Sequence, residues 1–302
     1  MLKRIITAVV LVGILLTLII TCGSWYFVAL MSLASFIGTY EMLKCTKLEK
    51  VYSVSIPSYI LSIVLPISVK LGFINEVGYS YVFALSAFYM LSLIVIFADS
   101  PVLTFENAAT AFLMISYVLF GFTCLTRIGC IESTGRYFYI TTWLIPVVTD
   151  SFAFFTGMAF GKHKLAPKIS PKKTIEGAIG GVVASVVAAF IFSYILERFF
   201  APSVNTLTLC VVAPFVSIVS QMGDLILSAV KRKYGVKDYG IIFPGHGGVL
   251  DRFDSVIATA VLVSMVERFF EVFTLFYKQA HRGSYEKNYS TRCNRLCRNA
   301  GT

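Results

Sequence analysis

Four polar residues lie at helical spacing within an otherwise apolar stretch, LCVVAPFVSIVSQMGDLILSAVKRK. They recur at steps of four, three and four, so a helix would carry them on one face: Ser217, Gln221, Asp224 and Ser228. A carboxylate inside a membrane is costly unless it is paired or bound to a cation, so such residues usually serve a function. Asp224 is therefore a candidate catalytic residue, and its hard oxygen atoms suit a divalent cation.

A second group of carboxylates opens the last apolar segment. Asp251, Asp254 and Ser255 stand at positions i, i+3 and i+4, which again share one face of a helix. Asp150, in an earlier apolar segment, is a further acidic residue that could join them. We predict Asp224, Asp251 and Asp254 as metal ligands, with Asp150 as a weaker candidate.

The loop between these two segments, GVKDYGIIFPGHGGVLDRFD, combines glycines with cationic side chains. Gly247 and Gly248 permit backbone geometries that turn N–H groups toward an anion. Five side chains in or beside the loop could hold phosphates: Lys231, Arg232, Lys237, His246 and Arg252. Carboxylates beside phosphate-binding cations are compatible when a metal ion lies between them, since magnesium usually binds one or two carboxylates plus substrate phosphates. The pattern indicates a nucleotide-polyphosphate site.

An earlier loop, GKHKLAPKISPKKTIEG, places five lysines before its first acidic residue. A charge run of this kind is most often a solvated loop. The SPKKT core differs, because Ser170-Pro171 interrupts the chain and Thr174 precedes the start of a helix, whose N-terminus favours anions. The predicted phosphate-binding residues of this loop are Ser170, Lys172, Lys173 and Thr174.

The composition places these residues in a membrane protein. The chain has 302 residues, of which 57% are hydrophobic and 14% are charged, with a mean hydropathy of +0.79. A soluble domain would carry about a quarter charged residues. Apolar runs that could cross a membrane as helices lie at roughly 5–21, 24–40, 54–72, 77–97, 107–126, 138–160, 178–197, 207–230 and 253–277. We therefore expect an all-α, polytopic integral membrane protein with about nine transmembrane helices.

Positive charge orients these helices. Four basic segments fall on one side of a nine-span arrangement, and that side is expected to be cytoplasmic: residues 3–4, 44–50, 162–173 and 231–237. We expect transmembrane scaffold helices in residues 1–140, a catalytic region with cytoplasmic loops in 141–277, and a basic, disordered tail in 278–302. Nine spans would place that basic tail outside, against the same rule. Small residues on either side of the lysine-rich loop predict close helix packing: Ala153, Gly157, Gly161, Gly177 and Gly181.

The stretch from Ser228 to Asp254 resembles the signature of the phosphatidate cytidylyltransferase, or CDP-diacylglycerol synthase, family. It matches at Ser228, Lys231, Arg232, Lys237, Asp238, Gly240, Pro244, His246, Gly247, Gly248, Asp251, Arg252 and Asp254. The SPKKTIEG loop and the QMGD sequence are similar to further motifs of that family. Two positions depart from it: Phe154 and Met158 stand where the family usually has tyrosine and arginine.

The resemblance implies an enzyme of phospholipid biosynthesis that converts CTP and phosphatidate to CDP-diacylglycerol and pyrophosphate. It implies Mg²⁺ as cofactor, with two cation sites, and an active site on the cytoplasmic face of the cell (inner) membrane. The catalytic residues expected on this basis are Asp224, Asp251, Lys231, Arg232 and His246. The partners are CTP and phosphatidate in the bilayer, without nucleic acid, and a homo-oligomer is left open.

Two other functions use some of the same features. A CTP-dependent polyprenol kinase would need the same metal and triphosphate groups but would attack a different phosphorus. A cation-coupled transporter would use Asp150 and Asp224 to relay ions. A transporter has no need of a GHGG loop with clustered cations.

Overall fold

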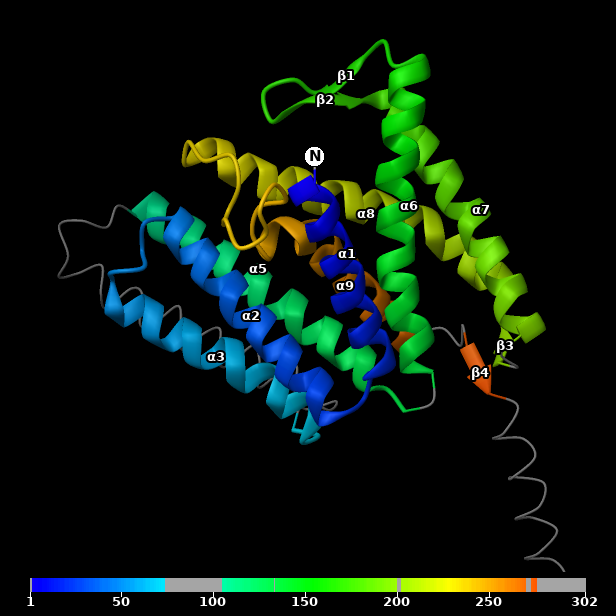
Figure 1. The fold of residues 1–302 in the computed structure, drawn as a ribbon, viewed down its shortest axis with the longest axis horizontal. Helices are drawn as coiled ribbons and strands as arrows, with labels where there is room; N and C mark the ends of the chain where they lie inside the picture. The colour runs from blue at the N-terminus through cyan, green and yellow to red at the C-terminus, as the bar shows by residue number, and fades with distance from the viewer. Residues whose placement is uncertain (1, 74–104, 133, 200–201, 270–272, 276–302) are drawn as a thin grey trace, which may run out of the picture.

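The computed structural model describes residues 2–73, 105–132, 134–199, 202–269 and 273–275, and the chain is mostly helical (Figure 1). The helices are α1 (Leu2–Ile20), α2 (Trp25–Cys45), α3 (Tyr52–Lys70), α5 (Phe105–Cys130), α6 (Gly135–Phe160), α7 (Ile175–Phe199), α8 (Thr206–Lys233) and α9 (Leu250–Phe269). Four short strands form two antiparallel pairs: β1 (Lys164–Ala166) with β2 (Ser170–Thr174), and β3 (Pro202–Val204) with β4 (Phe273–Leu275). The all-α expectation holds for the helical body but missed these strands.

Five of the described helices are long and apolar enough to cross a membrane: α2, α5 over Phe112–Cys130, α6, α7 and α8. The apolar parts of α1 and α3 are shorter, at Ile6–Ile20 and Val54–Lys70. The expected span at 77–97 lies outside the described residues. The count of about nine spans is therefore not confirmed, although the chain carries the helices of an integral membrane protein.

The expectation of a last span over 253–277 is wrong at its C-terminal end. Helix α9 ends at Phe269, and Phe273–Leu275 instead forms strand β4. The backbone groups of β4 pair with Pro202–Val204, the strand that leads into α8. This stretch of phenylalanines and β-branched residues suits a strand as well as a helix.

Helix α9 lies among α2, α5, α6 and α8 and is largely buried. Ile257 is fully buried against Gly121 of α5, where a β-carbon would collide with the isoleucine side chain. Hydroxyl groups on α9 find acceptors inside the protein: Thr259 Oγ1 donates to the carbonyl oxygens of Thr142 (3.3 Å) and Val256 (2.8 Å). Its low hydropathy is thus compatible with burial, because the polar side chains are hydrogen-bonded.

Helices α6 and α7 pack closely at the small residues predicted for this contact. A β-carbon on Gly177 would lie 2.5 Å from the carbonyl oxygen of Ala153 and 3.2 Å from the Cα atom of Gly157. Helix α8 joins this pair through a hydrogen bond of 2.9 Å from Thr149 Oγ1 to Ser217 Oγ. Three helices are thereby held together beneath the lysine-rich loop.

Basic segments from different parts of the chain approach one another. Thr7 of α1 donates to the carbonyl oxygen of Pro244 in the loop after α8 (3.2 Å). Arg232, at the end of α8, donates to the carbonyl oxygen of Ile169 in the lysine-rich loop (3.4 Å). In Figure 1 the start of α1, the β1–β2 hairpin and the loop after α8 lie near one another at the top of the view. Three of the four basic segments therefore lie near one another, and the side of the membrane that they face stays a prediction.

Candidate active site

The lysine-rich loop is a β-hairpin rather than an irregular loop. Strand β1 pairs with β2 so that Lys164 faces Thr174 across the ladder. Helix α7 begins directly afterwards at Ile175, and Thr174 Oγ1 accepts the N–H of Gly177 (3.1 Å) as a helix cap. The predicted helix start is confirmed, whereas the strand through SPKKT was not predicted.

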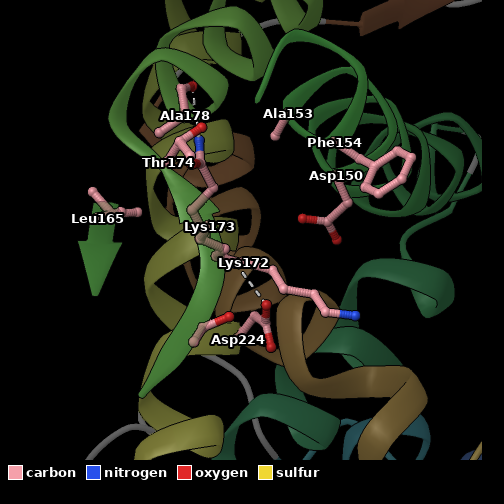
Figure 2. A pocket seen from close by; sticks show the side chains of 11 residues that line it. Asp150, Ala153, Phe154, Leu165, Lys172, Lys173, Thr174, Ala178 and Asp224 are labelled. Carbon is pink, nitrogen blue, oxygen red and sulfur yellow. Dashed lines mark hydrogen bonds and ion pairs between the residues drawn. The ribbon is translucent and has the colours of Figure 1, made fainter. Parts of the chain in front are cut away.

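The hairpin covers a cavity of about 290 Å³ between α6, α7 and α8 (Figure 2). Its wall combines carboxylates, lysines and small or apolar side chains: Asp150, Ala153, Phe154, Leu165, Ser170, Lys172, Lys173, Thr174, Ala178, Gln221 and Asp224. The four phosphate-binding residues predicted in the hairpin all line this cavity, together with two of the predicted metal ligands. Of the two departures from the family pattern, Phe154 lines the cavity and Met158 does not, and both are largely exposed (63% and 70%).

Lys173 and Asp224 form an ion pair across the cavity wall. The lysine Nζ lies 2.6 Å from Asp224 Oδ2, and each side chain is 24% exposed. Ser228 Oγ, one helical turn further along α8, donates to the other carboxylate oxygen at 3.2 Å. The positive charge of Lys173 also acts on Asp150, which faces the same cavity. An acidic and a basic group predicted from separate segments therefore meet in one place.

Lys231 and Asp251 form a second ion pair, deeper in the protein. Lys231 Nζ lies 2.8 Å from Asp251 Oδ1, and the two residues are 8% and 6% exposed. Asp251 Oδ2 accepts the backbone N–H groups of Tyr239 (2.8 Å) and Gly248 (2.9 Å). Both oxygens of Asp251 thus have donors from this chain, and the carboxylate fastens the end of α8 to the start of α9.

Tyr239 completes this second cluster. Its hydroxyl donates to the carbonyl oxygen of Leu227 (2.8 Å), and the Lys231 ammonium lies 5.3 Å from the centre of its ring. Burial raises the pKa of Tyr239, so the phenol stays protonated and remains a donor. Tyr239 therefore holds the loop after α8 against helix α8 through its hydroxyl and its ring, and against Asp251 through its backbone N–H.

Asp254 is a further carboxylate near the Lys173–Asp224 ion pair. Its Oδ1 accepts the N–H of Ser255 (2.8 Å), and its charge interacts with those of Asp224, Asp150 and Lys231. Among the described residues, no three acidic, histidine or cysteine side chains converge as a complete metal site. Carboxylates that repel one another still suit Mg²⁺, because substrate phosphates and water usually supply its other ligands. Cation binding by these carboxylates stays a prediction.

Four other predicted residues lie in or beside the loop after α8 and do not line the cavity: Arg232 at the end of α8, Lys237 and His246 in the loop, and Arg252 at the start of α9. Lys237 and Arg252 are exposed, and Arg232 is exposed beside the hairpin. His246 sits in a turn closed by a hydrogen bond from Phe243 N–H to the carbonyl oxygen of Gly247 (2.9 Å). The catalytic and binding roles of these residues stay predictions.

The glycines of the GHGG sequence serve the loop itself. Gly247 has a φ of +84°, a conformation that other residues rarely adopt, and a β-carbon there would lie 2.7 Å from Asp251 Oδ2. We expected the N–H of Gly248 to face a substrate anion, but it donates to the protein's own Asp251 carboxylate. The backbone at Gly248 does bind a negatively charged group, and that group is the Asp251 carboxylate.

One buried carboxylate at this loop was missed. Glu41 of α2 is 2% exposed and accepts the N–H groups of Val249 (3.1 Å) and Leu250 (2.8 Å). The sequence does carry a signal for it, since Glu41 is a single acidic residue at the end of a long apolar stretch. Residues 1–140 were expected to be scaffold because their apolar runs contain few ionisable residues, and Glu41 lies just after the run at 24–40.

The comparisons with known proteins show the family to which the chain belongs. The model of the cytidylyltransferase family matches residues 2–270. The phosphatidate cytidylyltransferases of Staphylococcus haemolyticus and Staphylococcus saprophyticus are 32% and 31% identical, each over 87% of this chain and 97% of the relative. The enzyme of the same name from Staphylococcus aureus (strain COL) is 32% identical over 54% of this chain and 60% of its own length. The chain belongs to the cytidylyltransferase family.

Proposed function

We propose that this chain is a phosphatidate cytidylyltransferase, a membrane nucleotidyltransferase that converts CTP and phosphatidate to CDP-diacylglycerol and pyrophosphate. The family match and the names of relatives that align with almost their full length support this reaction. The structural observation that carries it is the cavity in which Lys173 of the hairpin meets Asp224 of α8. Opposite charges gathered around a cavity suit two phosphate-bearing substrates.

The reaction needs charge neutralisation more than it needs a base. A phosphate oxygen of phosphatidate attacks the α-phosphorus of CTP, the bond to the β-phosphate oxygen breaks, and pyrophosphate leaves with its electron pair. The attacking group is already ionised, so no proton has to be removed. At 4 Å two unit charges of like sign repel by about 4 kcal/mol at an effective dielectric constant of about 20. Cationic groups around the cavity lower this barrier.

The residues divide into two proposed roles. Lys172 and Lys173 on the hairpin capture a substrate phosphate, because they face the cavity beside the start of α7. Lys231 and Arg232, at the end of α8, stabilise the charge that develops on the departing pyrophosphate. The ammonium of Lys173 also neutralises Asp224, to which it is paired.

Asp224 is the proposed principal ligand for Mg²⁺, with Asp254 and Asp150 adding negative charge nearby. A bound Mg²⁺ would neutralise the triphosphate and favour loss of pyrophosphate. Asp251 is also proposed as a ligand, and to take that role it would exchange its ion pair with Lys231 for the cation.

The proposed location is the cell (inner) membrane, with the cavity on the cytoplasmic face. Lysines crowd the hairpin and the end of α8, and positively charged loops favour the cytoplasm. This location also lets a soluble nucleotide meet a membrane-anchored lipid.

The test is turnover by the purified protein in mixed micelles with CTP and Mg²⁺. Pyrophosphate release that depends on added phosphatidate supports the proposal. Release of CDP with a polyprenol acceptor would instead indicate the kinase, and the absence of any phosphatidate-dependent product would refute the cytidylyltransferase.

A further inference from the structure

Glu41 is a buried carboxylate for which the proposed reaction mechanism has no use. It lies in the last part of α2, and none of the ion pairs found in the described part of the chain includes it. Burial of a charged group without compensation is costly, so a retained carboxylate needs partners that repay the lost hydration. Its partners are the backbone N–H groups of Val249 and Leu250, each accepted by a different carboxylate oxygen.

These N–H groups belong to the start of α9. The first N–H groups of a helix have no acceptor within the helix, and a negative charge there is stabilised by the helix dipole. An aspartate, asparagine, serine or threonine just before the helix usually fills this role. Here Val249 precedes α9 and has no polar side chain, so α2 supplies the cap from a distant part of the sequence.

Two glycines of the loop after α8 make room for the Glu41 carboxylate. A β-carbon on Gly240 or on Gly248 would collide with the Glu41 side-chain oxygens. The positions come from either end of the GIIFPGHGG sequence, so the loop closes around the carboxylate. These two glycines are therefore explained by Glu41 rather than by a turn, since a positive φ is found at Gly245 and Gly247 instead.

The same turn holds Asp251. The N–H of Gly248 donates to Asp251 Oδ2, and the next two N–H groups along the chain, of Val249 and Leu250, donate to Glu41. Three consecutive donors are thus shared between two carboxylates. A shift of the turn away from Glu41 would also shift Gly248 and, with it, the carboxylate that pairs with Lys231.

We propose that Glu41 is a positioning residue, which caps α9 from α2 and fixes the loop after α8 so that Asp251 and Lys231 keep their ion pair. The role of these two groups in turnover rests on the proposed function, whereas the effect on the loop does not. Glu41 touches no reacting atom in this account. Its influence passes through the backbone of residues 248–250.

The first arm of the test measures the loop directly and needs no substrate. Hydrogen–deuterium exchange of peptides covering residues 239–255 is compared between the wild type, Glu41→Ala and Glu49→Ala in detergent. Glu49, a partly exposed acid in the turn after α2, is the matched control. We expect the Val249 and Leu250 amides to exchange at least about tenfold faster in Glu41→Ala alone. Unchanged exchange in Glu41→Ala would overturn the proposal, whichever reaction the site performs.

The second arm measures turnover at a temperature at which thermal unfolding shows each variant to be folded. We expect Glu41→Ala to lower kcat by about tenfold or more with a smaller change in either KM, because the substrates do not touch Glu41. Glu41→Asp, which keeps the charge, should recover part of the loss. A kcat within about threefold of the wild type, or no recovery in Glu41→Asp, would overturn the positioning role. An inactive wild type would refute the proposed function but leave the exchange result standing.

A third variant covers the case in which Glu41→Ala fails to fold. Gly248→Ala puts a methyl group into the space of the Glu41 carboxylate. Gly248→Ala alone should speed amide exchange and lower kcat. Both changes should be smaller when Gly248→Ala is combined with Glu41→Asp, whose shorter side chain leaves room for the methyl group. If the effects of Gly248→Ala and Glu41→Asp simply add in the double variant, the methyl group and the Glu41 carboxylate do not compete for one space, and the proposal fails.

Discussion

The Lys173 ammonium on strand β2 lies 2.6 Å from the Asp224 carboxylate on helix α8, so the hairpin is tied to the core of the bundle by one ion pair (Figure 2). The two residues are 51 positions apart in the sequence, 224 minus 173. The pair closes a cavity whose wall carries both charges. Anionic substrates that reach Lys173 therefore arrive next to the carboxylate proposed to hold their cation.

Removal of the Asp224 charge should stop the reaction without unfolding the protein. We expect Asp224→Asn to lower turnover by more than about tenfold at saturating Mg²⁺, since even groups that only support a metal ligand cost about 10–100-fold. Initial rates in mixed micelles measure the effect, with thermal unfolding as the folding check. The control is Glu197→Gln, an exposed acid near the end of α7. A loss below tenfold at saturating Mg²⁺ would contradict the ligand role.

The hairpin lysines and the end of α8 should affect different kinetic constants. We expect Lys172→Ala to raise a KM with a smaller change in kcat, because Lys172 faces the cavity and is proposed to capture a phosphate. Arg232→Ala should lower both kcat and kcat/KM, because its proposed partner is charge that develops during turnover. The KM that rises, for CTP or for phosphatidate, identifies the anion held by the hairpin.

Lys168→Ala is the control for that pair of variants. Lys168 lies on the same hairpin and is exposed, but it does not line the cavity. Its removal should leave both constants near those of the wild type. The division of roles fails if Arg232→Ala raises only a KM while Lys172→Ala lowers only kcat.

Because α6 and α7 approach closely at Gly177, a larger residue there should lower the stability of the protein. A methyl group on Gly177 would lie 2.5 Å from the carbonyl oxygen of Ala153, so Gly177→Ala must push the helices apart. We expect a cost of about 1–3 kcal/mol, as for other overpacked contacts, measured as a lower midpoint of thermal unfolding in detergent. Gly13→Ala is the matched control, because nothing lies within 4 Å of its added methyl group. Equal midpoints in the two variants would contradict the packing.

The two basic loops should be reached from the same side of the membrane. With the native cysteines replaced by serine, Lys168→Cys and Lys233→Cys should resist a membrane-impermeant maleimide in intact cells and react after lysis. Labelling of either one from outside would refute the cytoplasmic assignment. Ser290→Cys in the same experiment would decide the side of the basic tail, which lies outside the described residues.

The sequence predicted the polar face of α8 well, because a helix repeats its surface at fixed steps. Ser217 contacts α6, and Gln221 and Asp224 face the cavity, as their spacing indicates. Ser228 supports Asp224, also in agreement with that face. The helix start after Thr174 was predicted equally well from its cap.

Contacts between distant segments were harder to predict. Nothing in the spacing of SPKKT shows that Lys173 reaches Asp224 rather than solvent, because this depends on a hairpin that folds back over α8. The pairing of Glu41 with the start of α9 joins residues about 200 positions apart and has no local pattern. The count of about nine membrane spans is not confirmed, because only five of the described helices are long and apolar enough to cross a membrane and the buried helix α9 is not among them.

The most direct measurement uses CTP labelled at one phosphate at a time. Purified wild-type protein and Asp224→Asn are each given phosphatidate, Mg²⁺ and CTP carrying ³²P at either the α or the γ position. We expect α label to enter the lipid and γ label to appear in pyrophosphate, and we expect Asp224→Asn to lose both products together. Label from the γ position in the lipid, or transfer of α label that is unaffected in Asp224→Asn, would contradict these expectations.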